Sequence, residues 1–383
     1  MKTIEIGVVK AQSQGYKAFI PNQFPPQTGL IFPEQLLVKN EKSTRLIGKL
    51  DGVTKQLPDV DFFLLMYLRK DAASSSQIEG TMATMVDAIE AEIGVGHSKT
   101  SADVDDILHY IQAVNYGMNR VTKDNFPLSL RFIRELHKKL MDKARATHFS
   151  DPGEFRASQN WIGGTRPDNA RFVPPPVEEM HVALNDLEVF LHADSPISTI
   201  IKAGLIHAQF ETIHPFLDGN GRTGRMLITF YLWKEGFLEY PVLFLSSYFK
   251  KHQEIYYERL SDYHNGRVYQ WIDFFLDGVI EISQEAIEIV DKITKQREID
   301  MQKIQMLGKR AAESAVPVLQ ELYKQPIVNN SLIQKITGFT RAGAQTVINR
   351  FIQIGILTPK DTDKKYGQSY IYKEYVDIFM GYQ

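Results

Sequence analysis

The sequence has 383 residues, more than one hydrophobic core usually supports, so we expect two or three domains. Its 43% hydrophobic and 23% charged residues are typical of a globular protein, and a net charge of −2 gives no overall attraction to nucleic acid or membranes. Cysteine is absent, which excludes disulfides and thiolate metal sites, and no apolar run approaches the ~20 residues that span a bilayer. We therefore expect a cytoplasmic protein with no membrane partner.

The N-terminal region, residues 1–120, is predicted to begin irregularly and then to become helical. Prolines are frequent in residues 1–60, which predicts an irregular wrap over a larger body. From about Asp61 the apolar residues take helical spacing. This spacing predicts one amphipathic helix over residues 74–94, which Ser74 or Ser75 can cap.

The middle of the chain, residues 121–298, is predicted to be a helical core with one interruption. The pair Gly163-Gly164 lies between β-forming residues, so residues 155–176 predict a β-hairpin or flap. Ser129 can cap one of the helices. Helices in and beside this core are expected over residues 103–121, 129–142, 177–190, 197–213, 222–236, 256–263 and 268–297.

The last part of the chain, residues 299–383, predicts a winged helix-turn-helix domain. Helices are expected over residues 311–323 and 331–336, followed by a third that Thr340 caps and Gly355 ends. Two strands around a basic turn are expected within residues 356–373. This order of elements is typical of the winged helix-turn-helix.

The charge of this domain is mixed where a DNA-binding surface is usually clearly basic. The third helix would read bases, and the turn would contact phosphates. The polar side chains concerned are Arg341, Gln345, Asn349 and Arg350 on the helix, and Lys360, Asp361, Asp363, Lys364 and Lys365 around the turn. DNA binding is therefore not favoured, and docking of a protein or of a second copy is the alternative.

The stretch from His214 to Arg225 reads His-Pro-Phe-Leu-Asp-Gly-Asn-Gly-Arg-Thr-Gly-Arg, and its glycines allow three interpretations. A dinucleotide-binding turn requires a preceding strand, whereas the preceding segment here is predicted to be helical. A P-loop requires Lys followed by Ser or Thr after the last glycine, and these are missing. The third interpretation is a glycine turn that opens a helix, whose free N–H groups bind phosphate.

The side chains of this stretch favour the third interpretation. Asp218 can hold Mg²⁺, with Mn²⁺ as the alternative, against phosphate oxygens. Arg222 and Arg225 are three positions apart, so on a helix both can reach one polyphosphate. His214 can accept a hydroxyl proton. His207 is interpreted as structural, because seven residues from His214 is not a helical zinc-ligand spacing.

All defined positions of this stretch match His-Pro-Phe-x-Asp-Gly-Asn-Gly-Arg-x-x-Arg, so it resembles the signature of the Fic (filamentation induced by cAMP) family. The resemblance implies a helical core and transfer of AMP from ATP to a Ser, Thr or Tyr hydroxyl of a protein, with release of pyrophosphate. It implies that His214 is the general base and Asp218 the metal ligand, and that a flap near residues 161–171 binds the target segment by strand addition. The implied nucleotide contacts are Gly219, Asn220, Gly221, Arg222, Thr223, Gly224 and Arg225.

A second motif, Ser75-Ser-Gln-Ile-Glu79-Gly80, resembles the inhibitory element Ser/Thr-x-x-x-Glu-Gly/Asn of the same family. The resemblance implies that Glu79 pairs with Arg225 and keeps the γ-phosphate of ATP away from it. ATP would then bind with its α-phosphate misaligned for in-line attack, which is costly in rate. We therefore expect an autoinhibited enzyme.

The sequence gives weaker signals for the residues that contact adenine and ribose. The resemblance implies that Lys251 lies near the nucleotide. Tyr256 and Tyr257 could border the base, and packing in the core is the alternative for both.

The sequence thus predicts a mainly α-helical, autoinhibited protein adenylyltransferase that also modifies itself. One alternative is a bifunctional enzyme in which Glu79 positions a water to remove AMP from a modified target. The transferred group could also be UMP or phosphocholine. An alternative from another class is a DNA-binding regulator with a weakly active core. The expected partners are ATP, an unidentified target protein and a second copy of the chain.

Overall fold

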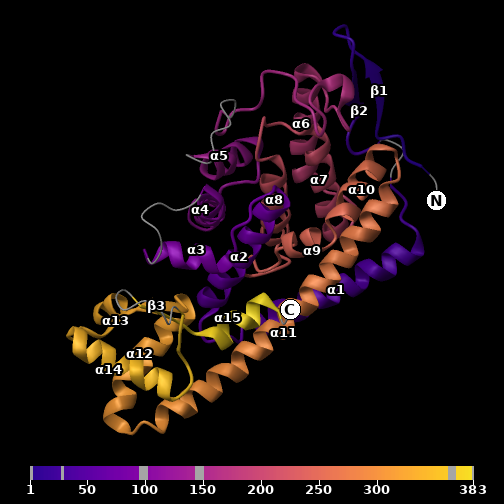
Figure 1. The fold of residues 1–383 in the computed structure, drawn as a ribbon. Helices are drawn as coiled ribbons and strands as arrows, with labels where there is room; N and C mark the ends of the chain where they lie inside the picture. The colour runs from indigo at the N-terminus through magenta and orange to yellow at the C-terminus, as the bar shows by residue number, and fades with distance from the viewer. Residues whose placement is uncertain (1–2, 27–29, 95–101, 143–150, 361–367, 382–383) are drawn as a thin grey trace.

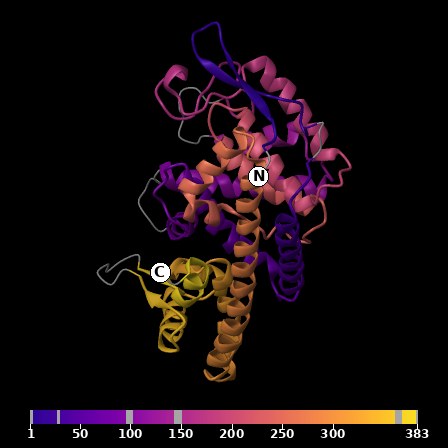
Figure 2. The same cartoon turned by 90° about the vertical axis from the view of Figure 1, so that its right-hand side faces the viewer.

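A computed structural model describes residues 3–26, 30–94, 102–142, 151–360 and 368–381. Helices make up most of these residues and the strands form two small sheets, so the predicted mainly α-helical class is confirmed. Figures 1 and 2 show a larger helical core and a smaller C-terminal domain beside the far end of one long helix, α11 (Val268–Gln305). Within the described ranges, no helix combines the length and apolar character that crossing a membrane requires.

Two helices at the centre of the core flank the glycine-rich motif. α7 (Thr199–Ile213) is buried along almost its whole length, and α8 (Asn220–Lys234) packs against it. Because both helices are covered on nearly all sides, neither shows the exposed polar face of a surface helix. The helices packed around this pair include α4 (Ala102–Lys123), α5 (Leu130–Met141), α6 (Val177–His192), α10 (Gln253–His264) and α11.

The helices predicted for the core are confirmed to within a few residues, except that α11 runs eight residues further than expected. The predicted cap of α5 is also confirmed, because the hydroxyl of Ser129 accepts a hydrogen bond from the N–H of Phe132 at 3.3 Å. A short helix, α9 (Ser246–Lys251), precedes α10 and was not predicted.

The prediction of an irregular wrap over residues 1–60 is wrong. The chain forms an antiparallel hairpin of β1 (Gly7–Ala11) and β2 (Lys17–Pro21), followed by α1 (Glu34–Thr54), which lies along α11. The prolines do not prevent these elements, because they lie at the edges of strands or between elements. Pro33 stands immediately before the first helical residue, where a missing N–H costs nothing.

The prediction of one helix over residues 74–94 is also wrong. Two helices occupy this region: α2 (Val60–Ile78), which begins earlier, and α3 (Met85–Glu92). Between them Gly80 has φ 97°, a value that ends a helix and that glycine adopts without steric cost. Thr84 then starts α3 with a capping box that it forms with Asp87.

The predicted flap is present as a short paired segment. Ile162 and Phe172 form an antiparallel bridge, and a 3₁₀ turn, Pro167–Asn169, lies between them. The flap is also tied to the N-terminal hairpin, because the N–H of Phe19 donates to the carbonyl of Val173 at 2.9 Å. The ring of Phe19 lies 5.8 Å from that of Phe172. The hairpin therefore braces the flap.

The C-terminal domain has its helices and strands in the predicted order. Its helices are α12 (Lys309–Lys324), α13 (Asn330–Thr337), α14 (Arg341–Gln353) and α15 (Lys373–Met380), and its strands are β3 (Ile327–Asn329), β4 (Thr358–Pro359) and β5 (Ser369–Ile371). The sheet order is β3-β5-β4. The cap at Thr340 is as expected, whereas β3 and α15 were not predicted. The predicted basic turn, including Asp361, Asp363, Lys364 and Lys365, lies outside the described residues.

Candidate active site

The loop between α7 and α8 follows an uncommon backbone path. His214 ends α7 with φ 48°, a left-handed value that few non-glycine residues adopt and that often marks functional sites. Gly219, with φ 77°, stands just before α8. The side chain of Asn220, the first residue of α8, accepts a hydrogen bond from the N–H of Phe216 and donates one to its carbonyl, both at 2.8 Å. The turn therefore opens a helix, as predicted, and the amide of Asn220 serves the loop.

Two side chains from the flap segment hold the backbone of His214. Arg156 Nε and Asn160 Nδ2 donate to its carbonyl oxygen at 3.0 and 3.2 Å. Burial lowers the pKa of the imidazole to about 4, so the ring is neutral at pH 7 and can take up a proton. No sequence pattern indicated Arg156 or Asn160, because their contacts depend on the flap segment folding back over the loop.

A buried carboxyl group, Glu211, lies beside His214 and was not predicted. Its Oε2 lies 3.9 Å from His214 Nδ1, and its Oε1 has no hydrogen-bond partner among the described residues. Burial raises the pKa of Glu211 to about 8. The sequence signal was the single acidic residue of a helix whose other residues are mainly apolar, which is unusual unless the group is paired or functional.

Arg225 is almost fully buried and binds the last turn of α2 and the residue after it. Its Nε donates to Ser75 Oγ at 2.9 Å, and its Nη2 donates to the Ser75 carbonyl at 3.0 Å and to Glu79 Oε1 at 2.7 Å. The charge of Glu79 raises the pKa of Arg225, against the opposing effect of burial. The expected contact between Glu79 and Arg225 is therefore present.

The Glu79 carboxylate also lies against the first turn of α8. A Cβ added to Gly221 would overlap with Glu79 Oε1 and would approach Arg225 Nη1 to 2.9 Å. Glycine at this position thus allows an anion to reach the start of the helix, where backbone N–H groups are free. The position that a phosphate would be expected to take is occupied by a carboxylate of the same chain.

Arg222, the other arginine of the motif, contacts a different carboxylate, that of Asp106. Arg222 Nη1 lies 3.4 Å from Asp106 Oδ1 on α4, and the other oxygen of Asp106 accepts from Thr81 Oγ1 at 3.4 Å. Both Arg222 and Asp106 are buried, and burial raises the pKa of Asp106. Asp106 was not predicted, although a carboxylate on the apolar stripe of the helix predicted over residues 103–121 was a detectable signal.

Asp218 lies in the loop before α8, with its Oδ1 3.9 Å from Arg222 Nη2. Its Oδ1 accepts the N–H of Gly219 at 2.6 Å, and the side chain is 42% exposed, so the carboxylate remains accessible next to the start of α8. No cluster of three or more metal-binding side chains occurs in the described part of the chain. One carboxylate fits a Mg²⁺ ion that takes its other ligands from phosphates and water, which is the usual arrangement for this metal.

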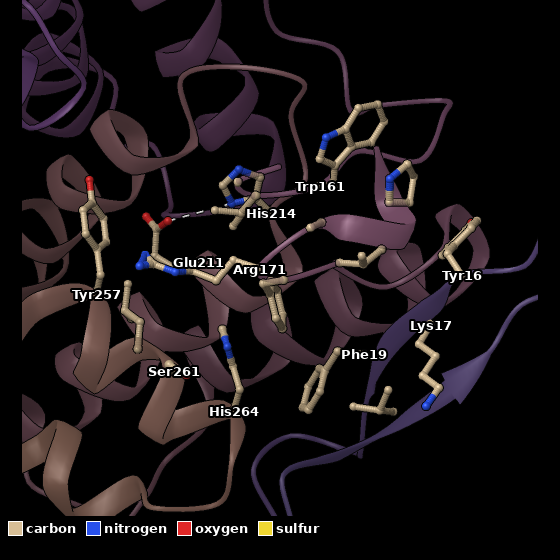
Figure 3. A pocket seen from close by; sticks show the side chains of 18 of the residues that line it. Tyr16, Lys17, Phe19, Trp161, Arg171, Glu211, His214, Tyr257, Ser261 and His264 are labelled. Atoms are coloured by element: carbon tan, nitrogen blue, oxygen red, sulfur yellow. Dashed lines mark ion pairs between the residues drawn. The ribbon is translucent and has the colours of Figure 1, made fainter. Parts of the chain in front are cut away.

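A cavity of about 1040 Å³ extends from Glu79, Glu211, His214, Gly221 and Arg225 to the flap and the N-terminal hairpin. Figure 3 shows Glu211, His214 and Tyr257 at one end and Tyr16 and Lys17 at the other. The volume slightly exceeds the roughly 300–1,000 Å³ typical of small-molecule pockets. It therefore has room for more than a nucleotide.

The remaining predicted contacts divide into two groups. Tyr257 and the buried Tyr256 line the cavity. Lys251 does not, because it is 63% exposed and pairs with Glu281 on α11 at 2.7 Å. Its predicted place beside the nucleotide is therefore not supported by the structure.

Two further motif positions serve helix packing. Thr223 is fully buried, and a Cβ on Gly224 would collide with Glu211 on α7, so this glycine permits the close approach of α7 and α8. The structure does not place Thr223 or Gly224 at the cavity surface. His207 is also buried, with its Nε2 2.9 Å from the hydroxyl of Tyr256, which agrees with its interpretation as structural.

The comparison with known sequences agrees with this geometry. The sequence pattern of the Fic/DOC family matches residues 127–232, and that of the Fic/DOC family N-terminal region matches residues 37–119. The chain is 25% identical over 239 residues to a protein adenylyltransferase Fic of Aedes aegypti, and 28% identical over 208 residues to one of Drosophila virilis. These alignments cover 61% and 52% of this chain but only 42% and 39% of the relatives.

Solved structures share the fold. A Fic family protein from Desulfovibrio desulfuricans G20 matches with a TM-score of 0.57 at 17% identity, over 90% of this chain and 97% of that one. A Fic domain containing signaling protein from Bacteroides thetaiotaomicron matches with a TM-score of 0.52 at 19% identity, over 67% of this chain and 97% of that one. Residues 37–119 and 127–232 thus match sequence patterns of the Fic/DOC family, and the chain shares the fold of these Fic proteins.

Proposed function

We propose that the protein transfers AMP from ATP to a hydroxyl group of a target protein, and that Glu79 holds this activity off. The observation that carries the proposal is the position of the Glu79 carboxylate, 2.7 Å from Arg225 and against Gly221 at the start of α8. A neutral histidine opens into the same cavity. The relatives named protein adenylyltransferase Fic support the reaction type.

The phosphates of ATP would bind at the N-terminus of α8. Gly221 leaves room for them, and the helix dipole favours negative charge there. Arg225 would hold the γ-phosphate and Arg222, oriented by Asp106, the β-phosphate. Asp218 would hold Mg²⁺, which would neutralise phosphate charge. The adenine would lie towards Tyr257, whose ring borders the cavity.

In the transfer step, His214 would accept the proton of the target hydroxyl as its oxygen attacks the α-phosphorus. A bond forms between that oxygen and phosphorus, and the bond from phosphorus to the oxygen that bridges to the β-phosphate breaks. Pyrophosphate leaves with the electron pair. Arg156 and Asn160, which hold the backbone of His214, would keep the ring in position.

In the resting state, Glu79 would compete with the γ-phosphate for Arg225. Two negative groups cannot share one guanidinium edge without repulsion, so ATP would bind displaced or not at all while Glu79 is in place. Ser75 adds two contacts that hold Arg225 towards α2. Small displacements of the reacting atoms lower the rate strongly, so partial displacement is enough for inhibition.

The test compares wild type, Glu79→Gly and Glu79→Gly/His214→Ala with Mg²⁺, ATP and a cell lysate, and reads AMP mass additions on the protein and on lysate proteins. We expect strong AMP addition by Glu79→Gly, little by wild type and none by Glu79→Gly/His214→Ala. Equal labelling by wild type and Glu79→Gly would contradict the inhibitory role. Labelling that persists without His214 would contradict the assigned base.

Removal of AMP from a modified protein is a second candidate, favoured by one observation. The Glu79 side chain is 38% exposed and lines the same cavity as His214, so its carboxylate could orient a water towards a bound phosphodiester. Incubating an AMP-modified protein with wild type and with Glu79→Gln separates the two activities, because only removal requires the carboxylate.

A further inference from the structure

Helix α2 contacts the active site at one end and the C-terminal domain along its earlier turns. Its last turn supplies Ser75, and Glu79 follows immediately, both bound to Arg225. Its first half packs against α12 and α15 of the C-terminal domain. The rings of Phe63 on α2 and Phe379 on α15 lie 6.3 Å apart. Glu79 therefore follows directly after the helix against which the C-terminal domain packs.

The junction is centred on Arg69, which is 2% exposed. Its Nη1 donates to the carbonyl of Lys324 at 2.6 Å, and its Nη2 donates to Gln325 Oε1 at 3.2 Å. Lys324 is the last residue of α12, so a cation here meets the unpaired carbonyls and negative end of the helix dipole. On the core side, the same guanidinium forms an ion pair with Glu92 of α3. One buried side chain thus joins α2, α3 and α12.

Two neighbouring contacts extend this junction over α3. Gln325 Nε2 donates to the carbonyl of Ile89 at 2.9 Å, so its amide group bonds to both α2 and α3. Lys360 of the C-terminal domain forms an ion pair with Glu90. The C-terminal domain therefore holds the two helices that flank the inhibitory turn at residues 79–84.

The distance between the junction and the inhibitory carboxylate is short and spanned by regular helix. Ten residues separate Arg69 from Glu79, which corresponds to roughly 15 Å at 1.5 Å per residue. Asp71, between them, accepts hydrogen bonds from the N–H of Ser246 at 3.1 Å and from the hydroxyl of Tyr110 at 2.7 Å. A shift of α2 at Arg69 would therefore be passed on to Glu79 through an ordered segment.

We propose that Arg69 is a positioning residue through which the C-terminal domain keeps Glu79 on Arg225. The proposal rests on the inhibitory role of Glu79 given above. When the C-terminal domain separates from α2, Arg69 loses the acceptors on Lys324 and Gln325, and its contact with Glu92 is what remains. With fewer contacts to fix them, α2 and α3 are held less firmly, and Glu79 leaves Arg225 more often. Any ligand that binds the separated C-terminal domain more tightly than the docked one would then activate the enzyme.

The experiment uses the full chain with Arg69→Met, Arg69→Lys, the milder Gln325→Ala on the opposite side of the junction, and Arg341→Met as a matched control. Arg341 is an exposed arginine on α14. Two quantities are measured: AMP incorporation from ATP, and amide hydrogen exchange of residues 69–80. Each activating variant is also combined with Glu79→Gly.

We expect Arg69→Met and Gln325→Ala to raise AMP incorporation at least about fivefold and to speed amide exchange at the end of α2. Arg69→Lys retains the charge beside Glu92 but loses the forked guanidinium group. Its AMP incorporation should lie between that of wild type and that of Arg69→Met. Arg341→Met should resemble wild type. Combination with Glu79→Gly should add nothing, because the inhibitory contact is already lost.

Unchanged exchange and unchanged AMP incorporation in Gln325→Ala and Arg69→Met would overturn the proposal. An increase that multiplies with that of Glu79→Gly would also overturn it, since Arg69 would then act by another route. If Glu79→Gly itself shows no AMP transfer, the proposed function fails. Amide exchange of residues 69–80 still decides whether the C-terminal domain positions α2.

Discussion

Replacement of Glu79 by glutamine tests the central electrostatic argument with little change in shape. The glutamine side chain of this variant could still accept a hydrogen bond from Arg225, but it would carry no charge to compete with phosphate. Ser75 would continue to hold the guanidinium through its hydroxyl and carbonyl oxygens. Any gain in activity would therefore report the ionic part of the contact.

The expected magnitude follows from the burial of the two partners. The Arg225 side chain is 2% exposed and that of Glu79 is 38% exposed, and they are 2.7 Å apart. A fully exposed pair contributes about 0–1 kcal/mol, and breaking a fully buried one costs about 3–5 kcal/mol. A half-exposed partner places this pair at about 1–2 kcal/mol, which corresponds to a factor of about 5–30. We expect kcat/KM for ATP to rise by that factor in Glu79→Gln, and further in Glu79→Gly.

The assay is AMP incorporation into the protein itself at several ATP concentrations, so that kcat and KM are separated. Arg225→Ala in the Glu79→Gln background is the control, because it should remove the gain if the gain depends on the γ-phosphate reaching Arg225. A change below about twofold, in a variant with an unchanged melting temperature, would refute the view that charge competition at Arg225 limits the reaction.

Three other expectations concern different parts of the molecule. Asp106→Asn in the Glu79→Gly background should lower kcat/KM for ATP about tenfold or more, because a charged hydrogen bond that orients Arg222 contributes about 1.5–3 kcal/mol; steady-state kinetics at unchanged melting temperature would check this. Phe19→Ala should loosen the flap and raise KM for a protein target while leaving KM for ATP unchanged, and an equal change in both would contradict a role of the hairpin in target binding. Thermal unfolding should show a loss of stability in acid, since burial lowers the pKa of four histidines to about 3 or 4. They are His137, His207, His214 and His264. Because the unfolded chain binds these protons from about pH 6.5 downwards and the folded chain does not, the contribution of the four histidines to the free energy of unfolding should be full above pH 6.5 and fall towards pH 3, by on the order of 1 kcal/mol per histidine at pH 5.5. A flat melting temperature between pH 7 and pH 5.5 would contradict this.

The parts of the site that could be predicted are those in which neighbouring residues decide the outcome. The turn from His214 to Gly219 and the start of α8 depend on local glycine geometry, so the sequence alone indicated a helix N-terminus there. The caps at Ser129 and Thr340 are equally local, and both are present. The contact between Glu79 and Arg225 spans 146 positions, and it was expected from the resemblance to a family.

The parts that could not be predicted depend on packing between distant segments. The helix expected over residues 74–94 followed an apolar spacing that continues through the turn at Gly80, and only the backbone conformation of that glycine separates the two helices. Asp106 and Glu211 are ordinary acidic residues until tertiary packing buries them beside Arg222 and His214. The hairpin of β1 and β2 is short, and it gains its place from contact with the flap.

The long helix α11 decides what kind of motion the C-terminal domain can make. Its 38 residues form a helix of about 57 Å that begins in the core and ends shortly before α12, with Gly308 at φ 84° between the two helices. Only residues 306–308 lie between α11 and α12, so a C-terminal domain released from α2 would stay close to it. The released surfaces would then remain at a high effective concentration, which favours their return. Inhibition by Glu79 would then recover within each molecule, without any inhibitor from outside and independently of how much protein is present.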